Sequence, residues 1–98
     1  MAEKVYVVIR VKATEAWFQL SEEERKSVME KAHKVRKDNG GEALANFPTY
    51  SSEWRWVDVL VFPDMAAYHK HTIAIGPKGQ NLQRYFDAEI TLGYERPA

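Results

Sequence analysis

Three residues of this 98-residue chain are candidates for acid–base or charge-binding chemistry because they lie among apolar neighbours. Arg10 interrupts a valine-rich segment, Asp58 interrupts an aromatic segment, and His69 lies on a predicted amphipathic helix. An arginine can hold a carboxylate, enolate or phenolate oxygen, and an aspartate or a histidine can move a proton. We therefore take these three as candidate catalytic residues. The structural alternatives are an ion pair between Arg10 and Asp58 and a hydrogen-bonded histidine in the core or a pocket wall.

The sequence contains none of the common motifs of metal, nucleophilic or nucleotide chemistry. There is no cysteine, and His69 and His71, two positions apart, diverge on a helix, so His71 is expected to be solvated. No Ser–His–Asp or Cys–His arrangement and no phosphate-binding or dinucleotide fingerprint is present. We predict no metal and no cofactor, with haem held by His69 as the alternative.

Composition narrows the class of partner. The 14 Lys and Arg balance the 14 Asp and Glu, and zero net charge disfavours a sequence-independent grip on nucleic acid or on an anionic membrane. No apolar run approaches 18 residues and the first residues form no apolar signal region, so we expect a cytoplasmic protein with no membrane partner. The length predicts one domain, residues 1–98.

Alternation and capping signals predict the order β-α-β-β-α-β. A capping box at Ser21 starts one helix and Asp64 caps another, whose inward stripe we predict as Met65, Tyr68, His69, Thr72 and Ile73. The predicted strands cover residues 4–12, 42–47, 54–62 and 88–95, and short helical turns cover 13–20 and 80–85. This order predicts the α+β ferredoxin-like sandwich, in which helices cover one face of a four-stranded antiparallel sheet and the other face is bare.

We expect the valine faces of two strands to lie beneath the helices. These faces carry Val5, Val7, Ile9 and Val11 in the first strand, and Arg55, Val57, Val59 and Val61 in the third.

The bare face would then carry much of the aromatic content, which is high at 3 Trp, 5 Tyr and 4 Phe. Its residues would be Tyr6, Val8 and Arg10 with Trp54, Trp56, Asp58, Leu60 and Phe62. Aromatic side chains of this size need a cover, and a second copy packed sheet to sheet supplies one. We therefore predict a homodimer, together with a pocket for a small aromatic or apolar molecule. The predicted pocket walls are Tyr6, Trp54, Trp56, Phe62 and Tyr68.

Three segments, VVIRVKATEAWFQLSEEERKSVMEKA, WRWVDVLVFPDMAAYHKH and RYFDAEITLGYE, resemble darcynin-like proteins of the dimeric α+β barrel superfamily. The resemblance spans nearly the whole chain and implies a homodimer of ferredoxin-like protomers with a pocket between sheet and helices. The superfamily includes cofactor-free monooxygenases, cyclases, lactone isomerases, haem-degrading enzymes and haem-dependent chlorite dismutases. It implies a cofactor-independent enzyme of the cyclase, isomerase or monooxygenase type, with a non-catalytic structural dimer as the alternative. Haem-degrading members use an Asn, Trp and His constellation, and the first strand here has no Asn.

RNA binding is a second alternative. Gly76-Pro77-Lys78-Gly79 is similar to the GXXG loop of a KH module, whose backbone approaches phosphates. The structural alternative is a glycine-bounded turn. Aromatic residues on the first and third strands are also similar to the platform of an RRM, although the third strand lacks the Lys/Arg-Gly-aromatic signature. Zero net charge disfavours both modules, and we expect no nucleic-acid partner.

Overall fold

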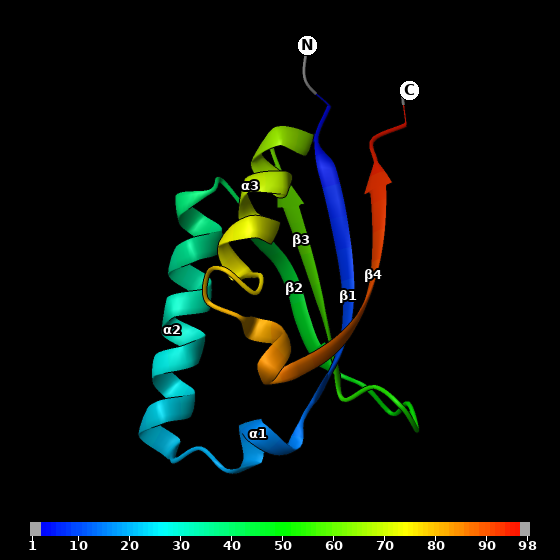
Figure 1. Cartoon of the computed structure of the whole chain (residues 1–98). Helices are drawn as coiled ribbons and strands as arrows, with labels where there is room; N and C mark the ends of the chain where they lie inside the picture. Colours follow the sequence, from blue (N-terminus) through cyan, green and yellow to red (C-terminus); the bar gives the residue numbers. More distant parts are fainter. Residues whose placement is uncertain (1–2, 97–98) are drawn as a thin grey trace.

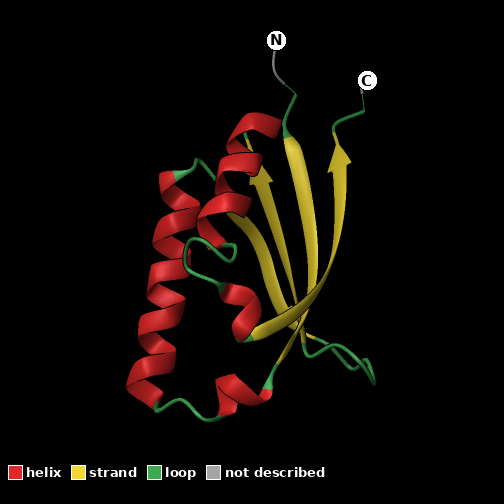
Figure 2. Ribbon diagram, in the orientation of Figure 1, coloured by secondary structure: helices red, strands yellow, loops and turns green. Residues whose placement is uncertain are grey.

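The computed structural model describes residues 3–96. Its sheet has four strands in the order β2-β3-β1-β4, each antiparallel to its neighbours, and the helices lie on one side of it (Figures 1 and 2). This confirms the predicted ferredoxin-like α+β fold. No helix within the described residues is long and apolar enough to cross a membrane. The elements are β1 (Val5–Ala13), α1 (Glu15–Phe18), α2 (Glu22–Asp38), β2 (Glu42–Pro48), β3 (Trp56–Phe62), α3 (Met65–Ile75), the 3-10 turn η1 (Leu82–Arg84) and β4 (Phe86–Tyr94).

The two long helices begin where the sequence signals them. The Ser21 hydroxyl accepts from the Glu24 amide at 3.1 Å, and the Glu24 carboxylate accepts from the Ser21 amide at 3.0 Å, which completes a capping box for α2. These bonds lower the pKa of Glu24 because the backbone donor favours its charged form. The Asp64 carboxylate accepts from the Ala67 amide at 2.7 Å and caps α3.

The core lies between the sheet and α3. Phe62 is fully buried, and its ring contacts Tyr68 and His71 of α3 at centroid distances of 5.5 and 5.0 Å. The helix α2 lies outside this layer and has α3 as its main neighbour (Figure 1). Gln80 Nε2 donates to the Val28 carbonyl at 3.0 Å and so joins the loop after α3 to α2.

The predicted face of β3 is wrong. Side chains directly opposite one another in an antiparallel pair share a face. Phe62 is covered by α3, so the β3 residues that alternate with it, Trp56, Asp58 and Leu60, also face the helices. The β3 valines therefore face the open side of the sheet. The larger side chains fill the space under α3, whereas the shorter valines make the flat open surface. For β1 the predicted face is confirmed, since its valines lie opposite Phe62 and the residues that alternate with it and so also face the helices. The register pairs Val5 with Phe62, Val7 with Leu60, Ile9 with Asp58 and Val11 with Trp56.

The predicted inward stripe of α3 is also wrong in part. His71, expected in solvent, is only 6% exposed, whereas His69 is exposed and Met65 and Ile73 are 53% and 58% exposed. The helix is rotated so that Tyr68 and His71, three residues apart, pack on the ring of Phe62. The third strand also begins at Trp56 and not at Trp54.

Candidate functional site

The carboxylate of Asp58 is the centre of a small polar cluster on the helix-facing side of the sheet. Trp56 Nε1 donates to Asp58 Oδ2 at 3.2 Å, and Asn46 Nδ2 donates to Asp58 Oδ1. Asn46 is opposite Asp58 in the register of β2 and β3, next to a register shift between Ala43 and Ala45. Sequence reasoning missed Asn46, since a bulge in an edge strand leaves no periodic signal from which its facing partner can be read.

Four aromatic rings adjoin this cluster at the end of the sheet where α1 and η1 lie (Figure 1). Phe86 contacts Trp56 at 5.6 Å and Trp17 at 4.9 Å between ring centroids, and Trp17 contacts Tyr85 at 6.2 Å. Asp58 and all four rings are half-buried. We call this group the Asp58 site; its members are Trp17, Asn46, Trp56, Asp58, Tyr85 and Phe86.

Arg25 fixes the position of α1, the helix that contributes Trp17 to the Asp58 site. Its Nε donates to the Trp17 carbonyl at 3.1 Å and its NH2 group donates to the Phe18 carbonyl at 3.0 Å. Its guanidinium also lies 5.7 Å from the Trp17 ring centroid. The first turns of α2 therefore fix the position of Trp17, which a four-residue helix could not do alone.

Arg10 and Tyr6 do not belong to the Asp58 site because they lie on the opposite face of the sheet. Arg10 forms an ion pair with Glu89 at 3.7 Å, so the alternative of an Arg10–Asp58 pair is wrong as well. The Tyr6 hydroxyl donates to Glu95 Oε1 at 3.1 Å, and this bond to a carboxylate raises the pKa of Tyr6.

The other predicted wall residues are also separate from Asp58. Trp54 precedes β3, and its ring lies 5.4 Å from Lys12 Nζ. Phe62 and Tyr68 belong to the core layer, and burial raises the pKa of the Tyr68 hydroxyl. Of the residues proposed from sequence, Trp56 and Asp58 are brought together and the others are not.

The two α3 histidines differ in their access to a ligand. His69 is exposed, whereas His71 lies against the Phe62 ring at 5.0 Å between centroids and is only 6% exposed. An axial haem ligand needs an open approach, which buried His71 lacks, so haem held by His69 stays a prediction. Within residues 3–96 no group of three or more His, Cys, Asp or Glu could hold a metal ion.

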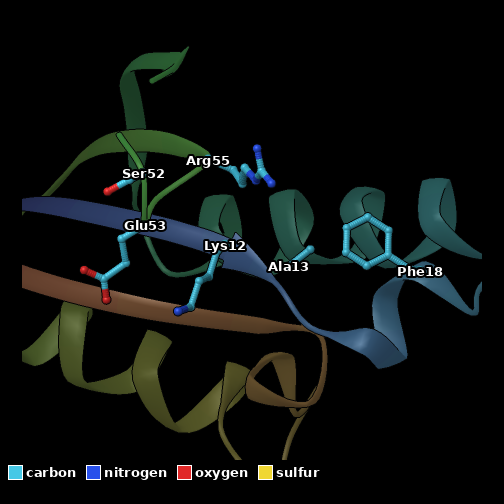
Figure 3. A pocket seen from close by; sticks show the side chains of 6 residues that line it. All are labelled: Lys12, Ala13, Phe18, Ser52, Glu53 and Arg55. Carbon is cyan, nitrogen blue, oxygen red and sulfur yellow. The ribbon is translucent and has the colours of Figure 1, made fainter. Parts of the chain in front are cut away.

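Two open grooves lie away from the Asp58 site. One, of about 410 Å³, lies at the end of β1 and is lined by Lys12, Ala13, Phe18, Ser52, Glu53 and Arg55 (Figure 3). Figure 3 shows Lys12 and Arg55 pointing in different directions, so these cations do not converge on one ligand. The second groove, of about 600 Å³, lies between the start of α3 and the end of β4 and includes Met65, Leu92 and Tyr94.

The glycines of the 76–79 loop have a packing role. The Gly79 amide donates to the Gly76 carbonyl at 3.0 Å, and the next amide, of Gln80, donates to the Ala74 carbonyl at 2.8 Å. A Cβ on Gly79 would overlap that Ala74 carbonyl. Backbone closure against the end of α3 therefore accounts for Gly79, as the structural alternative to a KH loop requires.

No protein-family model and no curated protein sequence matches the chain. Solved structures match nearly all of it. SnoaB, a cofactor-independent oxygenase from Streptomyces nogalater, is 18% identical with a TM-score of 0.61, and the match covers 99% of this chain and 97% of that chain. A dabb family protein with a ferredoxin-like fold from Mesorhizobium loti is 16% identical with a TM-score of 0.56, and the match covers 98% of each chain.

A mutant chlorite dismutase from Candidatus Nitrospira defluvii is 15% identical with a TM-score of 0.73, and the match covers 99% of this chain and 42% of that chain. The chain thus spans less than half the length of that protein. The darcynin-like resemblance has no counterpart among these matches and stays an expectation. Identities this low show a shared architecture and leave the activity open. The chain therefore has a ferredoxin-like fold, which it shares with these solved structures.

Proposed function

We propose that the protein is a homodimer that binds a small aromatic or apolar organic molecule at the Asp58 site and transforms it without a cofactor. The observation that carries the proposal is the Asp58 carboxylate, which is held by Asn46 and Trp56 beside a group of aromatic rings. Small-molecule sites combine apolar walls with a few fixed polar groups in this way.

The hydrogen bonds of Asp58 favour a role in proton transfer. Its two donors, Asn46 and Trp56, are neutral, and no Lys or Arg lies within 4.0 Å of it among the described residues. A carboxylate has about four acceptor positions, and two of these are in use. Asp58 can therefore accept a hydrogen bond from the hydroxyl of a phenol or enol that stacks on the rings, and then take its proton. The orientation of the carboxylate is already fixed by Asn46 and Trp56. Arg10 and His69 have no part in this mechanism.

One comparison supports the proposal. SnoaB, which matches over 99% of this chain, is a cofactor-independent oxygenase. Oxygenation of a deprotonated aromatic substrate by dioxygen, as the oxidant and co-substrate, is thus one reaction type for this site, alongside isomerisation and cyclisation.

The Asp58→Asn variant tests the site, with 2-naphthol as an ionisable aromatic probe. We expect 2-naphthol to quench tryptophan fluorescence in the wild type, and the variant to bind it roughly 10- to 100-fold more weakly, because a hydrogen bond to a charged group contributes about 1.5–3 kcal/mol. The matched control is Asp87→Asn, which removes an exposed carboxylate from β4 and should leave binding unchanged. Equal affinity in wild type and Asp58→Asn would overturn the assignment.

Native mass spectrometry of protein purified from cells tests the substrate class independently. We expect a retained aromatic or apolar molecule in the wild type and its loss in Trp56→Ala, which removes one wall of the Asp58 site. A retained RNA fragment would instead support the KH alternative at the 76–79 loop.

A further inference from the structure

The two edge strands of the sheet are protected to very different degrees. Native proteins blunt a free edge with proline, bulges, lysine or short length. The edge strand β2 has Pro48 at its end and a register shift between Ala43 and Ala45. The other edge strand, β4, is nine residues long, has neither proline nor lysine, and keeps an unbroken register with β1 from Phe86 to Tyr94. Its outer edge is therefore a regular row of backbone donors and acceptors, open on the side away from β1 (Figure 1).

This open edge also carries an uncovered apolar row. Ile90, Leu92 and Tyr94 are 51%, 44% and 74% exposed. They alternate along the helix-facing side of β4, as their register with Ile9, Val7 and Val5 requires. The helix α3 packs on β3 and leaves an open groove between its first turn and the Leu92–Tyr94 end of this row. Large exposed side chains in one row on an unprotected edge are typical of a strand that pairs with another chain.

The sequence of β4 is self-complementary in one antiparallel register. With Ile90 opposite its own copy, Ala88 faces Leu92 and Phe86 faces Tyr94, so every helix-side pair is apolar. On the other side of the sheet, Glu89 faces Thr91 and Asp87 faces Gly93, so no two acids meet.

Slips of two residues, which keep every side chain on its face, do not share this property. A slip of two residues in one direction places Glu89 opposite Glu89 of the second copy, and a slip of two in the other direction places Asp87 opposite Glu95. Like charges directly opposite one another are destabilising. The absence of like-charge pairs therefore selects the register centred on Ile90.

We propose that β4 pairs with β4 of a second copy of this chain about a two-fold axis at Ile90, which joins two sheets into one continuous sheet. The pairing is isologous and closes on itself. It leaves the valine-rich open face available, so it is compatible with packing of that face against further copies.

The pairing also completes the Asp58 site, a consequence that rests on the function proposed above. The partner's Tyr94 faces Phe86, which is the ring that links Trp17 to Trp56. A second copy thus supplies an additional aromatic wall at the end of the site nearest α1.

An introduced cysteine tests the register directly, because the chain has none. In Ile90→Cys the two Cβ atoms lie about 4.5–5.5 Å apart across the axis, close to the distance that a disulfide bridges. We expect Ile90→Cys, oxidised with glutathione disulfide at low micromolar concentration, to run mostly as a covalent dimer on a non-reducing gel. Circular dichroism checks that each variant is folded.

Two matched variants control for random collision and for register. Ile73→Cys places a thiol on α3 at similar exposure, 58% against 51%, and should remain monomeric on the gel. In Leu92→Cys the two thiols lie four strand positions apart, about 14 Å, and should not join. A folded Ile90→Cys that stays monomeric, or Leu92→Cys that joins as fast, would overturn the proposal. The gel detects strand pairing in the absence of any ligand. The pairing can therefore be disproved while 2-naphthol binding at the Asp58 site is confirmed, and binding can be disproved while the pairing is confirmed.

Discussion

Two histidines of α3 differ sharply in environment although they are two positions apart. His71 is buried against Phe62, and its Nδ1 has no hydrogen-bond partner among the described residues, whereas His69 is exposed. Burial lowers the pKa of His71 because it disfavours the charged imidazolium, and the nearby charge of Arg36 lowers it further. His71 is therefore expected to be neutral in the folded protein at pH 7.

This lowered pKa makes stability depend on pH with a definite sign. An unfolded histidine titrates near pH 6.5, so below about pH 7 the unfolded state takes up a proton that folded His71 resists. We expect the free energy of unfolding, measured by urea denaturation, to fall as the pH drops through 6.5. The slope should be shallower in His71→Gln and unchanged in His69→Gln, its exposed control. Equal slopes in wild type and His71→Gln would show that another group is responsible. Tyr68 packs on the same Phe62 ring, and because burial raises its pKa it stays protonated throughout this range.

At the same scale, the sequence predicted Asp58 and Trp56 as site residues but not their neighbours. Asp58 stands out because it is an acid among aromatics, which a sequence shows directly. Asn46 and Phe86 have ordinary local sequences, and they join the site only through the pairing of separate strands. Arg10 was placed beside Asp58 on the assumption of one shared face, and the observed register separates them.

At the scale of elements, alternation shows that a strand has two faces without showing which face is covered. Both β1 and β3 have one valine-rich face, and the same rule applied to both is right for β1 and wrong for β3. The covered face depends on the partner layer, since α3 brings Tyr68 and His71 against the ring of Phe62. Helix starts were predictable because their signals are local: a capping box and an Asp cap need only neighbouring residues.

The turn after α3 permits a test of its packing role. Gly79→Ala adds a methyl group that overlaps the Ala74 carbonyl, so backbone must shift. We expect it to lower the free energy of unfolding by about 1–3 kcal/mol, the usual cost of overpacking. The matched control is Gly93→Ala in β4, where the nearest atom to an added Cβ is Tyr6 Cβ at 4.0 Å, and the cost should be small. Equal stability of the two variants in urea denaturation would remove the packing explanation and leave the KH resemblance as the reason for Gly79.

At the scale of the whole molecule, the helices leave one side of the sheet open. That side carries Val8, Val59 and Val61, each only half-buried, while charged residues such as Arg10 and Glu89 pair beside them. A second copy laid on this side would cover the valines, and the Arg10–Glu89 pair beside them would enter the interface with its two charges already matched. The open face therefore still favours a homodimer, although valines and not tryptophans now form its centre.

The Val59→Lys variant tests this sheet-to-sheet homodimer. A lysine at the centre of the valine face would place a charge in the buried interface, where it has no partner. We expect the mass measured by sedimentation equilibrium to halve, whether the wild type is a face-packed dimer or a larger assembly that also uses the β4 edge. The control is Ser27→Lys, which adds the same charge to the exposed surface of α2 and should leave the mass unchanged. An unchanged mass in folded Val59→Lys would exclude the open face as an interface. A wild type that is monomeric at every concentration would exclude it as well.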